Sequence, residues 1–308
     1  EIYTLSLHDA LPIWSAVRTN SEGVVLEKVD LLMALIRGQW ADARGEFNRL
    51  NETVLAMGYK KTKDFILRAC LAMLSGEPGG GVNDARQFAS TTIQEALRTS
   101  FKEIGAAICD VLRFIADFSF IRSKNVPSFN PVLILICYRY AHPNEWKDIK
   151  AQARTFLFGA FLSEAFKKAS QAFMRALIDY AMHNSAFDIK EIERLCQKNG
   201  KELSVSIDSI LDISMKNPLA DLVLHLFYMG EAGYHSNEMT AKDHIFPDSK
   251  LREIKEGRRL KYRQDARDRI LNCELLTPKD NLTKGDSLPK DYFAQCNDDY
   301  PNPQLATT

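Results

Sequence analysis

Apolar residues recur three and four positions apart along most of residues 24–229, the spacing that places them on one face of an α-helix. The clearest series runs from about Asp84 to Asp117. Its apolar members are Phe88, Ile93, Leu97, Phe101, Ile104, Ile108, Leu112 and Ile115. Similar patterns predict helices over 26–54, 62–75, 132–141, 145–182, 188–198, 203–215 and 218–229. Strand signals are few before residue 230, so the pattern predicts a mainly α fold with a smaller, different C-terminal region.

The size and charge of the chain exclude several classes of protein. At 308 residues, the chain is long enough for two domains and a sizeable core. Its 40 Lys and Arg residues balance 40 Asp and Glu residues, which excludes a globally basic nucleic-acid binder but not a local basic face. The longest strongly apolar stretch, 131–141, is too short to cross a bilayer and contains Arg139. We therefore expect no transmembrane helix and no membrane partner.

Six cysteines are spread along the chain, and no two of them form a Cys-x-x-Cys pair. This spacing indicates neither a zinc ribbon nor a redox pair. Isolated cysteines in a chain of this length are typical of reduced thiols that pack as small apolar residues. Because there is also no secretory signal pattern, we expect a cytoplasmic protein.

The first thirteen residues show a pattern that is familiar from another source. Residues 1–13, EIYTLSLHDALPI, are similar to a reading-frame translation of a common sequencing-library adapter. We therefore expect the genuine coding sequence to begin near Trp14 and the natural protein to extend further upstream. His8 and Asp9 are excluded as site candidates for the same reason. The alternative is a genuine short strand or helix start.

No motif in the helical region indicates a particular reaction. The glycines of EPGGG at 77–81 are not followed by a Lys-Ser/Thr pair, so this segment is predicted to be a linker rather than a phosphate loop. His142, His183 and His225 stand apart without a ligand-spaced partner. We expect each of these histidines to have a structural or surface role.

Three short segments near the C-terminus combine residue types that suit phosphodiester hydrolysis. They are DHIFP at 243–247, NCELL at 272–276 and PKDNLTKG at 278–285. The first two are predicted to be short strands, because their residues are alternating or apolar and they are closed by Pro247 and Pro278. The third is predicted to begin a helix that carries Asn281 and Lys284, three residues apart, on one face.

These segments, in this order, resemble the HNH or His-Me finger nucleases, whose fold is a β-hairpin followed by a helix around one divalent metal. The resemblance implies a small C-terminal ββα-metal domain. It implies that His244 takes a proton from the attacking water, that Asn272 orients the strand of His244, and that Lys284 neutralises the phosphate. It also implies that Asp243 and Asn281 hold the divalent metal. Mg²⁺ is the expected metal, because carboxylate and amide oxygens suit this hard ion.

The sequence departs from the family at two points and leaves another explanation open. NCELL stands where the family usually has an Asn-Leu pair, and the 27 residues between His244 and Asn272 are more than minimal members have. In the alternative explanation, His244 is a buried side chain and the asparagines form turns, with no chemistry. One Asp-His pair alone would favour that explanation, whereas three ordered segments favour the nuclease.

The stretch 249–270 is locally basic, with nine Lys or Arg residues and four acidic residues. Its pattern is helical. One explanation is a solvated charged helix, and another is a surface that follows a nucleic-acid backbone. The sequence favours neither of them.

A second resemblance concerns the N-terminal part, where Arg-x-Asn-x-x-Gly precedes a Leu-x-x-x-Asp-Leu-Leu helix, followed by DFILRACLAML at 64–74. The seven residues of the first pattern are Arg18, Asn20, Gly23, Leu26, Asp30, Leu31 and Leu32. They resemble the end of the ParB-like domain of GmrSD-type restriction systems, in which a helical region and often an HNH-like nuclease follow. The resemblance implies a ParB-like remnant at 14–76, a helical domain at 77–230 and a nuclease domain at 231–308. In that family, nucleotide handling is linked to an upstream Asp-Gly-Gln-Gln-Arg motif, which is missing from this chain. We therefore expect a nucleotide only through the missing N-terminal part.

The sequence therefore predicts a cytoplasmic, metal-dependent endonuclease of a restriction or phage-defence system, with DNA as its partner. The second resemblance implies that this DNA is modified. One alternative is a non-catalytic nucleic-acid-binding or partner-regulated module that keeps the HNH-like fold. Another alternative is a nuclease that acts on RNA.

Overall fold

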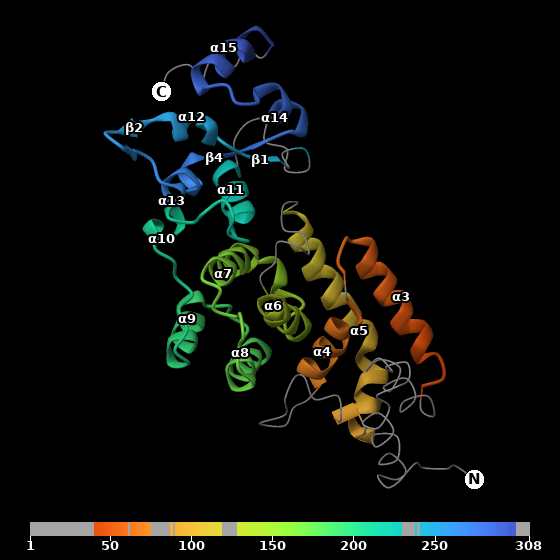
Figure 1. The fold of residues 1–308 in the computed structure, drawn as a ribbon. Coiled ribbons are helices and arrows are strands. Elements are labelled where there is room, and N and C mark those ends of the chain that lie inside the picture. The colour runs from red at the N-terminus through yellow and green to blue at the C-terminus, as the bar shows by residue number, and fades with distance from the viewer. Residues whose placement is uncertain are drawn as a thin grey trace, which may run out of the picture. The chain divides into compact units, whose positions relative to one another are not determined.

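The computed structural model describes residues 40–60, 62–74, 87–88, 90–118, 128–229, 238 and 241–299. Among these residues the fold is mainly helical, with a few short strands after residue 240, which confirms the predicted mainly α class (Figure 1). The described residues form two compact units. We call 40–117 with 128–204 the helical unit, and Phe118 with 205–299 the C-terminal unit. The adapter-like segment, the ParB-like pattern at 18–32 and the EPGGG segment lie outside the described residues.

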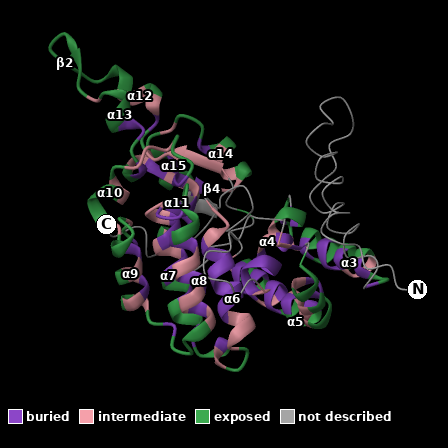
Figure 2. Cartoon of the chain, turned by 90° about the horizontal axis from the view of Figure 1, so that it is seen from below, coloured by how far each residue is buried: buried purple, intermediate pink, exposed green. Residues whose placement is uncertain are grey.

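The helical unit contains eight described helical elements. They are α3 (Ala43–Ala56), α4 (Thr62–Leu74), α5 (Thr91–Ala116), α6 (Asn130–Ala141), the 3₁₀ helix η2 (Glu145–Lys147), α7 (Lys150–Leu162), α8 (Gln171–His183) and α9 (Ile189–Lys198). Helix α6 is the centre of the unit, because it packs against α4, α5, α7 and α8. Its residues 131–138 are all buried (Figure 2), as expected for a helix that is apolar on every side.

Seven of the eight apolar residues predicted for the long helix lie in the core, and Ile93 is half-buried. The seven at 88, 97, 101, 104, 108, 112 and 115 are each at most 5% exposed. Helix α5 begins at Thr91, several residues after the predicted start near Asp84. The periodicity therefore identified the buried face correctly, although it placed the first turn too early.

The single helical pattern predicted over 145–182 is divided into η2, α7 and α8. Between α7 and α8, Glu164 and Lys168 have positive φ angles of 51° and 55°, which an α-helix does not allow. Ser170 then restarts the helix, because its Oγ accepts a hydrogen bond from the backbone N–H of Phe173. The apolar periodicity continues across this break, which is why the sequence pattern did not reveal it.

The C-terminal unit is built from short elements. They are α10 (Ile207–Leu211), α11 (Ala220–Tyr228), β1 (Ala241–His244), α12 (Asp248–Glu253), β2 (Lys255–Glu256), β3 (Arg259–Leu260), α13 (Gln264–Arg267), the 3₁₀ helix η3 (Ile270–Asn272), β4 (Cys273–Leu276), α14 (Pro278–Lys284) and α15 (Pro289–Asp299). Apart from Phe118, the described part of this unit begins at 205, whereas the expected boundary is at 230. Residues 205–229 join it because α11 packs against β4 and Ser214 pairs with Arg269 in an isolated bridge.

Two strands and a helix overlap the three C-terminal segments. Strand β1 includes only Asp243 and His244 of the first, β4 spans Cys273–Leu276 of the second, and α14 spans Pro278–Lys284 of the third. Strands β1 and β4 are antiparallel, and α14 packs against both of them. Thr277 begins α14, since its Oγ1 accepts a hydrogen bond from the backbone N–H of Asp280. Pro278 occupies the first turn, where its missing N–H costs nothing.

The continuous helix predicted over 249–270 is wrong. The segment contains two short helices, α12 and α13, on either side of the β2–β3 hairpin. Gly257 has a φ angle of +64° at the turn, a conformation that ends a helix and suits a tight hairpin. The charged residues at helical spacing thus resemble a helix, whereas the glycine determines the actual geometry.

Two further expectations concern the cysteines and the membrane. Cys70, Cys109, Cys137, Cys196 and Cys273 are buried free thiols, as expected of cysteines that pack as apolar residues. In the part of the chain that the structure describes, no helix has both the length and the apolar character needed to cross a bilayer.

Candidate active site

The candidate residues meet where β1, β4 and α14 come together. In the antiparallel register, Asp243 lies opposite Glu274 and His244 lies opposite Cys273. Helix α14 follows β4 after a single residue and brings Lys284 onto this pair of strands. The sequence-predicted residues 243, 244 and 284 are therefore in direct contact with one another through Lys284.

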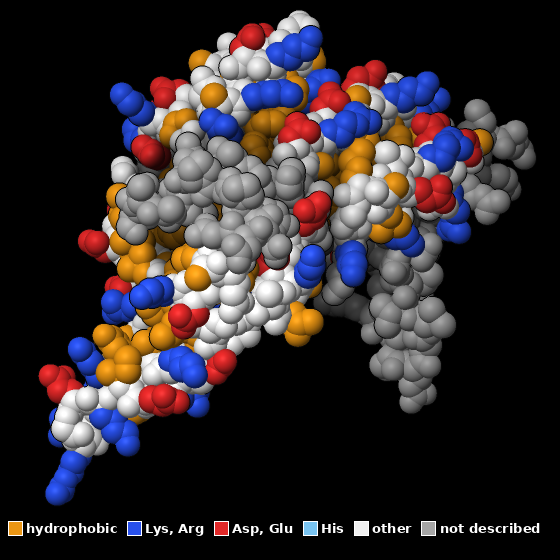
Figure 3. All heavy atoms as spheres, turned by 90° about the horizontal axis from the view of Figure 1, so that it is seen from above, with side chains coloured by type: hydrophobic (Ala, Val, Ile, Leu, Met, Phe, Trp, Pro, Cys, Tyr) orange, Lys and Arg blue, Asp and Glu red, His pale blue; other side chains and the backbone are white. Residues whose placement is uncertain are grey.

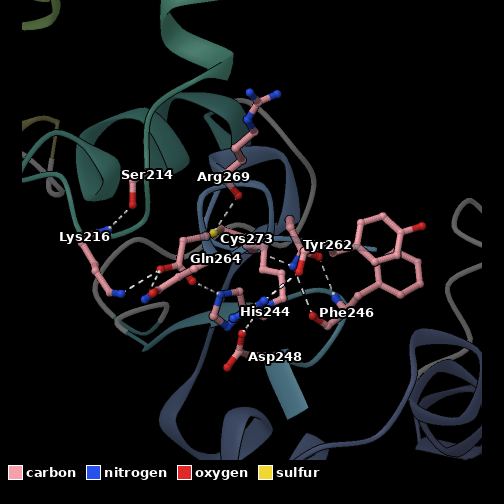
Figure 4. A network of polar contacts seen from close by, with 12 residues as sticks. Ser214, Lys216, His244, Phe246, Asp248, Tyr262, Gln264, Arg269 and Cys273 are labelled. Atoms are coloured by element: carbon pink, nitrogen blue, oxygen red, sulfur yellow. Dashed lines mark hydrogen bonds and ion pairs between the residues drawn. The ribbon is translucent and has the colours of Figure 1, made fainter. Parts of the chain in front are cut away.

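His244 is held by an acidic side chain that the sequence analysis did not single out. The Nε2 atom of His244 lies 3.2 Å from Oδ1 of Asp268 (Figure 4). The His244 side chain is 15% exposed. When Nε2 carries the hydrogen and donates it to Asp268, Nδ1 is the nitrogen that can accept a proton. No described residue forms a hydrogen bond with Nδ1.

Asp268 is itself fixed by its neighbours. Its Oδ2 accepts hydrogen bonds from Lys216 Nζ at 2.8 Å and from Gln264 Nε2 at 3.4 Å (Figure 4). The hydrogen bond from Lys216, together with those from His244 and Gln264, holds the pKa of Asp268 below its usual value, although burial acts in the opposite direction. Asp268 is thus an ionised acceptor for His244 at neutral pH.

Asn272 ties the segment after His244 in place. Its Oδ1 accepts a hydrogen bond from the backbone N–H of Phe246 at 2.9 Å, and its Nδ2 donates to the Phe246 carbonyl at 3.1 Å. The same Nδ2 donates to the Arg267 carbonyl at 2.9 Å. The Asn272 amide therefore holds two parts of the chain, at Phe246 and at Arg267, beside His244. An effect of Asn272 on catalysis stays a prediction.

Lys284 lies in the interior, and not on an open surface beside the site. The residue is 2% exposed. Its ammonium group donates to Asp243 Oδ2 and to the His244 backbone carbonyl, and it forms an ion pair with Glu274 Oε1 at 3.0 Å. An ammonium group has three hydrogens, and these three acceptors use all of them. The expected contact between Lys284 and a phosphate therefore does not fit this geometry.

The cluster around Lys284 retains negative charge. Asp243 and Glu274 carry two carboxylates against one ammonium group. Burial raises the pKa of Glu274, and the hydrogen bond from Lys284 opposes that rise. No described residue donates to Oδ1 of Asp243, and the Asp243 side chain is 27% exposed. One carboxylate oxygen is therefore accessible to a cation.

Asn281 lies on α14, the helix that packs against β1 and β4. It lies three residues before Lys284, and residues at this spacing share one face of a helix. Asn281 is half-buried, and its side chain forms no hydrogen bond with a described residue. The structure thus places the two residues predicted to bind a metal on two elements that pack together, β1 and α14.

Asp243 and Asn281 could contribute two oxygens to a divalent cation that keeps most of its water ligands. Within the described residues, no group of three or more His, Cys, Asp or Glu side chains is placed to hold a metal ion. An Asp–Asn pair is a different kind of site, because Mg²⁺ keeps several waters and is commonly held by one or two protein oxygens. The accessible oxygen of Asp243 and the net negative charge beside it suit such an ion.

The other histidines have local roles that agree with expectation. His183 Nδ1 lies 2.8 Å from the Asp179 carbonyl, and the His142 ring packs against Tyr138 with ring centres 4.9 Å apart. His225 is 7% exposed.

Comparison with known proteins gives no further assignment, because no protein-family model matches the chain and no curated protein matches it significantly.

Proposed function

We propose that the C-terminal unit is a metal-dependent endonuclease module of the HNH type that hydrolyses DNA phosphodiester bonds. One observation carries the proposal: His244 is paired through Nε2 with the ionised Asp268, beside an Asp243 oxygen that no described residue occupies. A proton acceptor and a cation ligand are thus adjacent in sequence and fixed by different partners.

The proposed chemistry assigns each residue one task. Hydrolysis needs a water nucleophile, a group that accepts its proton, and positive charge near the phosphate oxygens. His244 accepts the proton at Nδ1, and Asp268 holds the ring in the required tautomer. A bound Mg²⁺ supplies the positive charge. Asp243 and Asn281 would hold this ion.

Lys284 then acts as a positioning residue. Its ammonium group holds Oδ2 of Asp243 and the His244 carbonyl, so it fixes the end of β1. Asn272 fixes the segment that follows. The two residues restrict the backbone on both sides of the His244 side chain.

The wider biological assignment rests on the sequence resemblance. It comprises a GmrSD-type restriction or phage-defence enzyme, modified DNA as the substrate and a cytoplasmic location. The ββα-metal identity of the C-terminal unit is supported by the order β1, β4 and α14 and by their mutual packing.

A second candidate function is a non-catalytic nucleic-acid-binding or partner-regulated module of the same fold. The ion pair between Lys284 and Asp243 favours it, because the lysine neutralises the carboxylate that would otherwise hold the metal. The basic segment near the site would then be the functional part.

One assay separates the two candidates. The full chain is incubated with supercoiled plasmid DNA, with Mg²⁺ or with a chelator, and nicked and linear products are followed. The nuclease proposal expects cleavage that requires the metal and is lost in Asp243→Ala. Binding to the plasmid without metal-dependent cleavage would support the non-catalytic module and contradict the nuclease.

A further inference from the structure

The segment between α12 and α13 projects from the C-terminal unit as a two-stranded ribbon. We call residues 254–261 the basic hairpin. Lys255 pairs with Leu260 and Glu256 pairs with Arg259, and Lys261 N–H donates to the Ile254 carbonyl at 3.0 Å. Every residue from 252 to 261 is exposed, as Figure 2 shows at the end labelled β2. The hairpin therefore adds nothing to the core of its unit.

The basic hairpin carries an excess of unpaired positive charge. Residues 250–263 contain seven Lys or Arg residues and two Glu residues. Only Lys250 and Arg252 among the seven form ion pairs with described residues, namely with Asp286 and Asp248. The other five are Lys255, Arg258, Arg259, Lys261 and Arg263. The register of the two strands places these cations on both faces of the ribbon and at its turn. In Figure 3, Lys and Arg side chains cover much of the arm that projects at the lower left.

The base of the segment is clamped beside His244. Arg267 Nε lies 2.5 Å from Asp248 Oδ1, and Arg267 Nη1 donates to the Tyr262 carbonyl at 2.7 Å (Figure 4). The Arg267 side chain is 5% exposed and that of Asp248 is 25% exposed, so the guanidinium side of this clamp is buried. Both sides of this clamp are close in sequence to the proposed site. Asp248 lies four residues after His244, and Arg267 lies immediately before Asp268, which contacts His244.

The turn of the hairpin has a defined geometry. Gly257 and Arg258 are the two central residues, and only Gly257 has a positive φ, as in a type II′ turn. This turn matches the twist of the strands and keeps the ribbon narrow. A free two-stranded hairpin is at best marginally stable in water. Because residues 252–261 are exposed and do not pack on the core, the clamp and the turn maintain the shape of the hairpin.

From these observations we infer that the basic hairpin enters the major groove of double-stranded DNA and presents the duplex to the His244 site. The inference rests on the proposed function and names the form of its substrate. The major groove of B-form DNA is about 12 Å wide and admits a two-stranded ribbon. Unpaired Lys and Arg side chains on both faces can then contact phosphates on the two walls. Ile254 and Leu260, 42% and 45% exposed, suit apolar contacts inside the groove.

The shape of the ribbon favours duplex DNA over duplex RNA. The major groove of A-form RNA is deep and narrow, and protein side chains do not read it. A hairpin that acts by entering a groove should therefore distinguish the two duplexes. A cation patch that acts by charge alone should bind both.

The test measures binding of the full chain to a short labelled DNA duplex by fluorescence anisotropy, in EDTA and over about 50–200 mM salt. Arg258→Gln with Arg259→Gln should weaken binding about tenfold or more at low salt, and should lower the slope of log Kd against log salt by about 1.8, since each phosphate contact contributes about 0.9. The control with matched charge is Lys190→Gln with Lys198→Gln on the exposed surface of α9, which should leave both quantities unchanged.

A second variant tests shape without changing charge. Gly257→Val places a β-branched residue at a φ of +64° and should distort the turn. Nothing lies within 4 Å of the added Cβ, so the variant should still fold, which circular dichroism can verify. Duplex DNA binding should fall severalfold, whereas the weaker binding to duplex RNA should not change.

The outcomes separate this inference from the proposed nuclease activity. If the double glutamine variant binds duplex DNA as tightly as the wild type, the inference is wrong, whether or not the protein cuts DNA. Equal binding of duplex DNA and duplex RNA by the wild type would also overturn it. If the hairpin variants lose binding but the wild type shows no metal-dependent cleavage, the hairpin inference holds and the nuclease proposal fails.

Discussion

The imidazole of His244 and the carboxylate of Asp268 lie 3.2 Å apart although 24 residues separate them in the chain. The contact crosses the whole basic segment, because α12 leaves the end of β1 and α13 returns to it. Asp268 thereby holds Nε2 of the ring, which leaves Nδ1 of His244 as the nitrogen that can accept a proton.

Removing the charge of Asp268 should slow the chemical step. In Asp268→Asn, the amide offers a weaker and ambiguous partner to His244, so the population of the required tautomer falls. We expect kcat to decrease about 10- to 100-fold with little change in KM, as for other side chains that orient a histidine. The control is Asp265→Asn, which changes an exposed carboxylate on α13, the short helix that ends just before Asp268. Rates are compared per folded molecule, and an unchanged kcat in Asp268→Asn would exclude a positioning role.

Asp268 should also make stability depend on pH in the acid range. Its pKa in the folded protein lies below the unfolded value of about 3.9, chiefly because Lys216 donates to it. Its contribution is therefore fully present above that unfolded value and is lost as the pH falls through the folded pKa. The melting temperature of the wild type should exceed that of Asp268→Asn at pH 7, and the difference should shrink as the pH falls toward about 3. A difference that is the same at both pH values would contradict this account.

Truncating Lys284 should destabilise the fold. Lys284→Met leaves the largely buried carboxylate of Glu274 and the partly exposed carboxylate of Asp243 without their shared, buried cation. Breaking a buried ion pair from one side costs roughly 3–5 kcal/mol. Denaturant unfolding measures this cost, with the exposed Lys279→Met on the same helix as the control. A Lys284→Met protein of normal stability that binds DNA more weakly would instead place Lys284 on the phosphate.

The metal requirement should depend on Asp243 more than on any surface acid. In Asp243→Asn, Lys284 keeps its other two acceptors, but the accessible oxygen loses its negative charge. We expect half-maximal cleavage to require about 10- to 100-fold more Mg²⁺, because the site loses a charged carboxylate ligand. The exposed Asp291→Asn is the control. An identical Mg²⁺ dependence in Asp243→Asn and the wild type would remove Asp243 from the metal site.

The sequence predicted the local parts of the site, because these depend on neighbouring residues. The alternation in DHIFP and NCELL indicated two strands, and Pro278 marked the first turn of α14. The same spacing placed Asn281 and Lys284 on one face of that helix. It did not say which way the face points, and the burial of Lys284 between two carboxylates follows from how α14 packs on β1 and β4.

Asp268 and the basic hairpin were not predicted, for different physical reasons. The contact of Asp268 with His244 depends on a long excursion of the chain, so no spacing in the sequence reveals it. Asp268 is one of four acidic residues in a basic stretch and has the same local appearance as the exposed Asp265. The hairpin did have a signal, because Gly257 stands at the turn, but the charges at helical spacing on both sides favoured a helix.

The most direct test of the account is cleavage by His244→Ala, measured per folded molecule beside DNA binding. If His244 accepts the proton of the attacking water, cleavage should fall roughly 10²- to 10⁴-fold while DNA affinity stays unchanged, because binding rests on phosphate contacts elsewhere. His183→Ala, which removes a histidine from the end of α8, should cleave like the wild type. Undiminished cleavage by folded His244→Ala protein would contradict the central claim.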